Sequence, residues 1–171
     1  MLTERTGLAL VHVAAKPARA GFLDAAPGAL GVPLPLEPNT TAPSPELTAF
    51  WFGPGRWLIE SERLSANEIE GRLRAASDAG GIAIADLSSG RTVICVCGEA
   101  ARRTLAQGCP IDLHPGAFPP GTIAHSMLEG ISVMLHHLPD GNAFDLYVPR
   151  SYSLATWEWL TEAAGAGRKP G

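Results

Sequence analysis

Charged residues are scarce in this chain: they make up 18% of it, against roughly 25% in typical globular proteins. Basic residues form no stripe, Arg102-Arg103 is the only basic pair in the body of the chain, and the formal net charge is -4. This scarcity excludes the electrostatic footprint of a nucleic-acid-binding protein. Apolar residues reach 46%, so the chain either builds a large core or keeps part of its surface for a partner protein.

Long apolar runs and paired cysteines are missing too. No run approaches the roughly 20 residues that a membrane-spanning helix needs, and the first residues, MLTERTGLAL, lack the basic and then apolar order of a signal peptide. The three cysteines are an odd number, and Cys95 and Cys97 share one face of a predicted strand. These absences favour a reduced, cytoplasmic protein with no membrane and no nucleic-acid partner.

What the chain does contain is an alternation of predicted hairpins and helices. Strands are predicted at 7–15, 47–52, 56–61, 82–87, 91–98, 122–128, 131–138 and 143–149, and helices at 18–31, 66–79, 99–108 and from near Ser151. This order is typical of an α+β fold with mixed, largely antiparallel sheets and three to four helices. We expect a single domain over 1–164, undivided or with two packed halves that meet near residue 80, and a disordered tail over 165–171.

Two short segments carry the clearest local signals. Ser65, with Glu68 three residues later, predicts a capping box that opens a helix at Ala66. The sequence GPGRW at 53–57 sets glycines beside an arginine, but a phosphate-binding turn would have to lead into a helix N-terminus, and this one leads into a strand. The segment is therefore predicted to be a hairpin turn.

A proline-rich connector at 109–121 contains Cys109, Asp112 and His114 within six positions. A metal site needs three or four converging ligands, and a nucleophilic cysteine needs a histidine held by a third group. The chain offers no second paired cluster, and the adjacent His136 and His137 would point to opposite faces of a strand. We therefore expect a structural loop, in which Cys109 is buried, Asp112 accepts backbone N–H groups and the ring of His114 donates.

Two further patterns point to a partner rather than to catalysis. In DLSSGRT (86–92), Asp86 and Arg91 are predicted to brace a turn as an ion pair, and an exposed Arg91 would be free to contact a partner. Trp157 and Trp159 lie about 200° apart on a helix, so both are not expected to face the same core. One of them is predicted to point outward or toward a partner, because tryptophan often anchors interfaces.

Several segments resemble one family in the same order along the chain. They are PLPLEPNTTA, AFWFGPGRWLIE, SGRT, GCPIDLHPGAFPPG and FDLYVPRSY. Together they are similar to the gamma subunit of heterotetrameric sarcosine oxidase, over roughly residues 7–164.

The resemblance implies an assembly role. Enzymes of this family oxidatively demethylate sarcosine to glycine, with H2O2 and either formaldehyde or methylenetetrahydrofolate as products. The resemblance implies that FAD, FMN, NAD, tetrahydrofolate and zinc are held by the alpha, beta and delta subunits, and that the gamma chain has no catalytic, cofactor-binding or metal-binding residue. It also implies a fold like part of the T-protein (aminomethyltransferase) folate-binding domain. The residues expected at an interface or in the connector are then Arg91, Cys109, Asp112, His114, Trp157 and Trp159.

Two alternatives stay open at this stage. One is a standalone folate or pterin binder of the T-protein type, in which Asp86 or Asp145 would bond the pterin ring. The other is the equivalent subunit of a related oxidase that acts on a different N-methyl amino acid.

Overall fold

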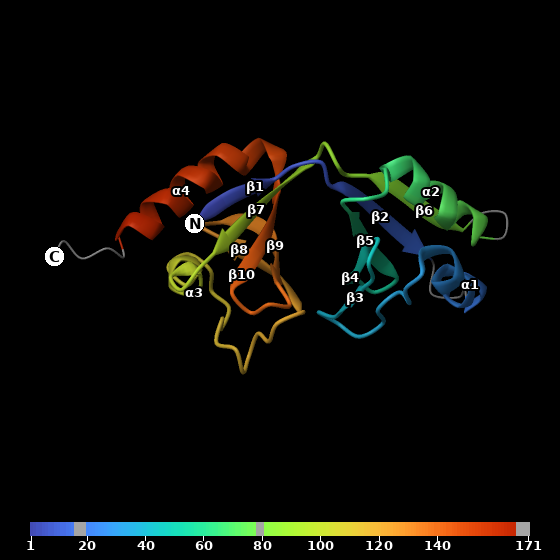
Figure 1. Ribbon diagram of the computed structural model, residues 1–171, viewed down its shortest axis with the longest axis horizontal. Coiled ribbons are helices and arrows are strands. Elements are labelled where there is room, and N and C mark those ends of the chain that lie inside the picture. The colour runs from blue at the N-terminus through green and yellow to red at the C-terminus, as the bar shows by residue number, and fades with distance from the viewer. Residues whose placement is uncertain (16–19, 78–80, 167–171) are drawn as a thin grey trace. The chain divides into compact units, whose positions relative to one another are not determined.

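The computed structural model describes residues 1–15, 20–77 and 81–166 and divides the chain into two compact units (Figure 1). Unit 1 comprises Met1–Thr6 and Gly90–Gly171, and unit 2 comprises Gly7–Ser89. Each unit contains a five-stranded antiparallel sheet, and helices cover one face of it. The predicted α+β class with largely antiparallel sheets is therefore confirmed. The expectation of one domain over 1–164, with halves meeting near residue 80, stays a prediction.

The sheet of unit 2 has the strand order β3-β4-β5-β2-β6. Its strands are β2 (Ala9–Ala15), β3 (Thr41–Pro43), β4 (Thr48–Gly53), β5 (Arg56–Ser61) and β6 (Ile82–Asp86). The turn between β4 and β5 is the predicted hairpin. It needs glycine at position 55, where φ is +65° and a Cβ atom would lie 2.6 Å from the carbonyl oxygen of Ala15.

The helices of unit 2 are α1 (Ala20–Leu30) and α2 (Ala66–Ala75). The predicted capping box is present, since Ser65 Oγ accepts the N–H of Glu68 and the Glu68 carboxylate accepts the N–H of Ser65. The predicted end of α2 near residue 79 is wrong. The N–H of Ser77 bonds to the carbonyl of Arg74, a tight turn that closes the helix after Ala75. Both helices contribute to one apolar core with β2 and β5.

The sheet of unit 1 has the strand order β1-β7-β10-β9-β8. Its strands are β1 (Leu2–Arg5), β7 (Arg91–Cys97), β8 (Ile123–Leu128), β9 (Ile131–His137) and β10 (Ala143–Pro149). The β8–β9 hairpin turns through Glu129 and Gly130, both at positive φ, as a two-residue turn of the type that matches strand twist. The short strands β1 and β3 were not predicted from the sequence.

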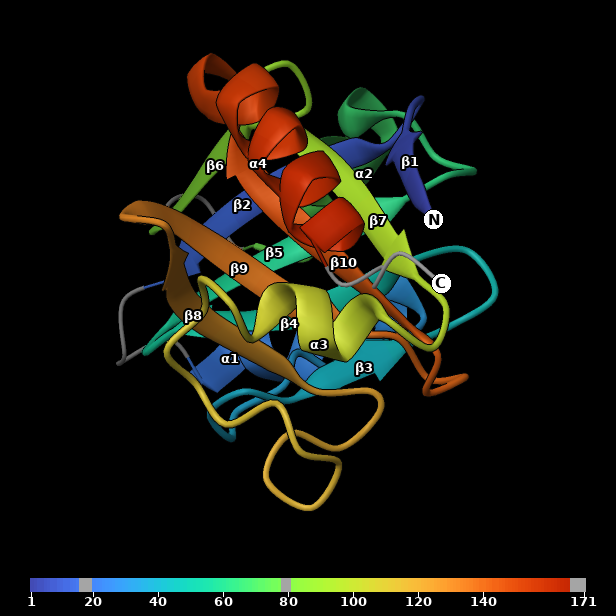
Figure 2. The same ribbon diagram turned by 90° about the vertical axis from the view of Figure 1, so that its left-hand side faces the viewer.

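The helices of unit 1 are α3 (Ala101–Leu105), the 3-10 turn η1 (Arg150–Tyr152) and α4 (Ser153–Ala166). Figure 2 shows α3 and α4 lying across the same face of this sheet, where their side chains join its apolar core. Helix α4 continues to Ala166, two residues into the segment expected to be a tail, and the rest of that segment lies outside the described residues. In the part of the chain that the structure describes, no helix is both long and apolar enough to cross a membrane.

Candidate functional site

The connector at 109–121, which we call the signature loop, begins where α3 ends. The N–H of Cys109 closes the last turn by bonding to the carbonyl of Leu105 at 2.9 Å. The Cys109 side chain is buried, as predicted, and its Sγ lies 3.5 Å from Ser126 Oγ on β8. Leu113 and Phe118 also lie in the core of unit 1. The loop is therefore held down by buried apolar side chains at intervals along its length.

Asp112 and His114 lie on the exposed side of the signature loop. Asp112 accepts the backbone N–H of His114 at 2.8 Å, as predicted. The prediction that the His114 ring donates is wrong for Nδ1, which accepts the N–H of Gly116 at 3.1 Å. Because Cys109 is buried while the other two side chains are exposed, the three side chains do not converge on one site. Asp112 and His114 instead stabilise the turn of the loop by accepting its backbone N–H groups.

His137 fastens the far end of the signature loop to the sheet. Its Nδ1 bonds to the carbonyl of Phe118 at 2.8 Å, and its ring stacks on Phe144 with a centroid separation of 4.5 Å. The Arg102 guanidinium lies 5.1 Å from the centre of the Phe144 ring and 3.4 Å from His137 Nε2. Sequence reasoning missed this cluster. His137 on β9 and Phe144 on β10 are paired in the sheet. Their contact could be predicted only if the register of these two strands were known.

A row of polar side chains crosses the opposite face of the same sheet. The register places Cys95 beside Asp145, and Asp145 beside His136. Asp145 is wholly buried and forms an ion pair with Arg5 of β1. This confirms that His136 and His137 point to opposite faces, since His137 stacks among the side chains of the helix-covered face.

Burial sets the protonation of this row. It raises the pKa of the Cys95 thiol to about 12, with the neighbouring Asp145 carboxylate as the second cause. It lowers the pKa of His136 to about 4, and the Arg5 charge adds to the effect. At neutral pH the thiol is therefore protonated and the imidazole neutral, which is the opposite of what a cysteine nucleophile with a histidine base requires.

The predicted residues Asp86 and Arg91 make local contacts. The Asp86 carboxylate accepts both the N–H and the hydroxyl of Ser88, at 2.8 and 2.5 Å. Asp86 lies in unit 2 and Arg91 in unit 1, so the predicted brace between them stays a prediction. Arg91 is half-buried at the start of β7, and burial lowers its pKa.

Trp157 and Trp159 are both half-buried and both pack against the core of unit 1. The expectation that they could not share a core is wrong, because α4 rests on the sheet with one tryptophan on each flank. The Trp159 ring fills the space over Gly108, where a Cβ atom would lie 2.5 Å from it. Trp157 lines a groove of about 550 Å³ between α3, α4 and β1, with uncharged neighbours such as Leu2, Ala101 and Thr104. Their role at an interface stays a prediction.

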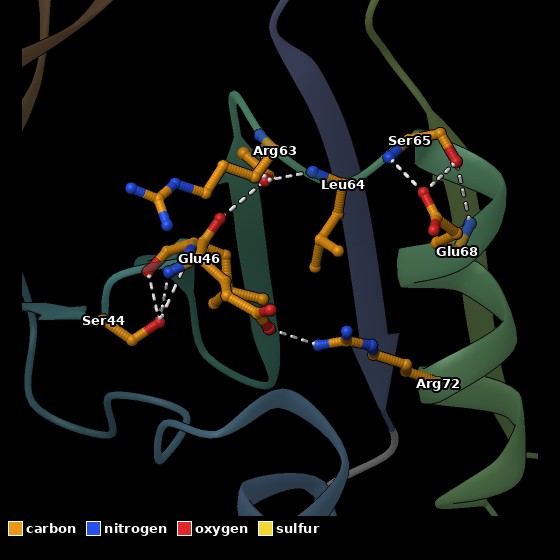
Figure 3. Close-up of polar contacts among 9 residues, drawn as sticks. Ser44, Glu46, Arg63, Leu64, Ser65, Glu68 and Arg72 are labelled. Atoms are coloured by element: carbon orange, nitrogen blue, oxygen red, sulfur yellow. Dashed lines mark hydrogen bonds and ion pairs between the residues drawn. The ribbon is translucent and has the colours of Figure 1, made fainter.

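Polar contacts in unit 2 also serve the local structure (Figure 3). Ser61 Oγ donates to the carbonyl of Glu46 at 2.6 Å and accepts the N–H groups of Arg63 and Leu64. The Glu46 carboxylate reaches Arg72 of α2 at 2.9 Å. These bonds tie the chain before β4 to the end of β5 and to α2. Across the described ranges, no three His, Cys, Asp or Glu residues are grouped closely enough to hold a metal ion.

Comparison with known proteins gives one consistent result. The model of the sarcosine oxidase, gamma subunit family matches residues 12–166. The chain is 35% identical over 158 residues to the sarcosine oxidase subunit gamma of Corynebacterium sp. (strain P-1), covering 90% of this chain and 74% of the relative. It is 34% identical over 155 residues to the Arthrobacter sp. protein of the same name, with the same two coverages of 90% and 74%.

Solved structures give the same result. A chain of the heterotetrameric sarcosine oxidase from Corynebacterium sp. U-96, solved in complex with pyrrole 2-carboxylate, matches with a TM-score of 0.91 and 26% identity. The match covers 100% of this chain and 86% of that one. The glycine cleavage system aminomethyltransferase T from Bartonella henselae matches with a TM-score of 0.64 and 15% identity, over 93% of this chain and 44% of that one. This second likeness concerns the fold alone.

Proposed function

Because the chain belongs to the sarcosine oxidase gamma subunit family, we propose that it is a non-catalytic assembly subunit of a heterotetrameric sarcosine oxidase. The observation that carries the proposal is the match over the whole chain, with a TM-score of 0.91, to a chain of a heterotetrameric sarcosine oxidase. Both units of the present chain lie within that match, so the fold of the whole chain is that of an oxidase component.

The chemistry of the candidate residues supports a non-catalytic role. Asp112 and His114 are used in the turn of the signature loop. Cys95 is protonated and His136 neutral at physiological pH. A general base or nucleophile needs a pKa matched to its task and a partner that orients it. The raised pKa of Cys95 and the lowered pKa of His136 are the opposite of what a thiolate nucleophile and a histidine base require.

The assembled enzyme would convert sarcosine, O2 and water to glycine, formaldehyde and H2O2, or deliver the one-carbon unit to tetrahydrofolate. We assign FAD, FMN, NAD, tetrahydrofolate and zinc to the alpha, beta and delta subunits, and the whole complex to the cytoplasm. The part of this chain is to hold those subunits in place. Its own residues take no step in the reaction.

The test is a pull-down of the tagged chain after co-expression with the alpha, beta and delta subunits of a heterotetrameric sarcosine oxidase, followed by an absorbance scan of the eluate. The expected result is co-elution of three further chains with a flavin spectrum that sarcosine bleaches. A colourless chain that elutes alone would contradict the proposal, and titration with tetrahydrofolate would then test the folate-binding alternative. If another N-methyl amino acid bleaches the flavin faster than sarcosine does, the assembly role stands and the substrate assignment is wrong.

A further inference from the structure

A cavity of about 510 Å³ lies in unit 1, where the end of α3 and the start of the signature loop meet the β8–β9 turn. Of its described lining residues, Glu129 alone carries a charge. The Met127 side chain is 44% exposed, and Ala106 and Pro110 are exposed as well. The cavity therefore combines one carboxylate with exposed apolar side chains.

The backbone conformation of Glu129 suits other residue types better. Its φ is +47°, in the left-handed region, and Gly130 follows at +80°. Asparagine, aspartate or glycine is the usual first residue of such a two-residue hairpin turn. A residue that is held in a sparsely populated conformation often marks a functional position. The unusual conformation therefore points to a use for the Glu129 side chain.

Two contacts position Glu129 at the cavity. Its backbone N–H bonds to the carbonyl of Gly108 at 3.1 Å. A Cβ atom on Gly108 would lie 3.1 Å from Glu129 Cγ and 2.5 Å from the Trp159 ring, so both side chains lie over this glycine. Within the part of the chain that the structure describes, no basic side chain forms an ion pair with the Glu129 carboxylate. The carboxylate is thus held in place and lacks a cation.

The chemistry of the lining distinguishes between possible occupants. A Ca²⁺ or Mg²⁺ ion takes about six or more oxygen ligands, which a single carboxylate does not supply. An apolar side chain would bury the charge of Glu129 without a partner, which is costly. An arginine side chain satisfies both parts of the cavity, because its guanidinium pairs with a carboxylate and its stem covers apolar surface such as Met127. Arginine is also enriched at protein interfaces, whereas lysine is depleted.

We propose that this cavity binds an arginine side chain of another subunit of the oxidase, which forms an ion pair with Glu129. The inference rests on the proposed function and names a contact that this function uses. The matching solved structure is a heterotetramer, so a chain of another kind is the expected source of the arginine. The Glu129 carboxylate then serves assembly rather than the fold of unit 1.

The first test is a competition between the original chain and a tagged variant, co-expressed with the alpha, beta and delta subunits of a heterotetrameric sarcosine oxidase. Glu129→Gln removes the charge and keeps the shape, so its share of the purified complex should fall by at least about fivefold. Glu129→Lys should be incorporated still less, because it places a like charge against the arginine. Glu99→Gln is the matched control, since Glu99 is exposed in unit 1 and does not line the cavity. It should compete like the original chain.

The second test separates assembly from folding. Glu129→Asn places a residue at position 129 that favours a positive φ, so the isolated chain should unfold at a higher urea concentration than the original. The same variant lacks the charge, so its share of the complex should fall as that of Glu129→Gln does. Opposite effects on stability and on assembly are expected only if the carboxylate serves a partner. A variant that lowers both would show that Glu129 serves the fold, which overturns the proposal.

Each remaining outcome decides between the claims. If the complex forms and Glu129→Gln competes like the original chain, the arginine site is wrong and the assembly role stands. If Glu129→Lys is incorporated as well as Glu129→Gln, the occupant carries no positive charge, and if EDTA abolishes the difference between Glu129→Gln and the original chain, the occupant is a metal ion. Either result overturns the proposal, as would an equal loss for Glu99→Gln. If the original chain does not assemble with the oxidase subunits, the proposed function fails and the site fails with it.

Discussion

The two units have five-stranded sheets of similar strand order, but they differ in which part of the sequence supplies the outermost strand. Each places three consecutive strands side by side, β3-β4-β5 in unit 2 and β8-β9-β10 in unit 1, and adds two more strands beside them. In unit 2 the outermost added strand, β6, is the last of its sheet in sequence. In unit 1 the outermost strand, β1, is the first of its sheet in sequence. It pairs with β7, although all residues of unit 2 lie between these two strands in the sequence.

The difference also appears in what holds the outer strand. β6 is fastened by backbone bonds and by two isoleucines against an apolar core. β1 is short, with two of its four residues exposed, and its Arg5 pairs with the buried Asp145 two strands away. A strand that must be brought back from a distant part of the chain has a larger loop-closure cost than one nearby. We infer that a buried ion pair helps to fix β1, whereas β6 needs none.

The largest expected effect comes from breaking that ion pair. Asp145→Ala leaves the Arg5 charge without its buried partner, which typically costs about 3–5 kcal/mol. The free energy of unfolding, measured with urea, should fall by that amount. Replacing both residues, as Arg5→Met with Asp145→Leu, should recover much of the loss. A loss below about 1 kcal/mol for Asp145→Ala would show that the pair does not hold unit 1 together.

The second prediction is that stability falls at low pH because of His136, which also lies in unit 1. Since the pKa of His136 is about 4 in the folded chain and ordinary in the unfolded chain, the unfolded state binds more protons between these two values. Stability is therefore retained above about pH 6.5 and falls as the pH drops toward 4, by up to about 3 kcal/mol. The measurement is the urea midpoint against pH. His136→Gln should flatten the curve, and an unchanged pH dependence in that variant would contradict the assignment to His136.

Two glycine-to-alanine substitutions, one in each unit, should change the free energy of unfolding in opposite directions. Gly108→Ala in unit 1 drives a Cβ atom into the Trp159 ring and should cost about 1–3 kcal/mol. Gly71→Ala in α2 of unit 2 meets nothing within 4 Å and should stabilise by about 0.5–1 kcal/mol, because alanine favours a helix interior. Thermal unfolding followed by tryptophan fluorescence measures both. Equal effects would mean that Trp159 does not pack as described.

The capping box of unit 2 should have a smaller effect. Ser65→Ala removes the acceptor for the N–H of Glu68, a loss of about 1 kcal/mol for a typical N-cap. Ser65→Thr retains a hydroxyl that accepts the N–H of Glu68 and donates to its carboxylate, and it should be close to neutral. If the alanine and threonine variants unfold at the same urea concentration, the cap does not stabilise α2.

The smallest effect is expected for the ion pair of unit 2. Glu46 and Arg72 meet at 2.9 Å with side chains 51% and 35% exposed, and such surface pairs contribute about 0–1 kcal/mol. Glu46→Gln should therefore change the free energy of unfolding by no more than about 0.5 kcal/mol. A loss as large as that of Asp145→Ala would remove the contrast between the two units.

Local signals in the sequence predicted most elements of unit 2, although not the short strand β3. The GPG turn between LTAFWF and RWLIES and the box of Ser65 and Glu68 each act over a few residues, and each was found in the structure. The end of α2 was missed because it depends on a tight final turn and not on the glycines that follow.

The candidate site residues and β1 depended on distant contacts. LTER carries two charges and no alternation of apolar residues, so only its pairing with β7 makes it a strand. The sequence showed that Asp145 lies in an apolar strand, but not that Arg5 pairs with it. The His137 cluster and the Trp159–Gly108 contact likewise join residues that are far apart in sequence. The sequence was sufficient to predict which segments are helices and strands. Predicting the polar contacts would also have required knowing how the strands pair.

Native mass spectrometry of the complex, co-expressed with and without this chain, shows whether the chain is needed for assembly. We expect one copy of this chain in a complex with the other three subunits, and a loss of that complex when the chain is omitted. An intact, sarcosine-oxidising complex that forms equally well without this chain would contradict it.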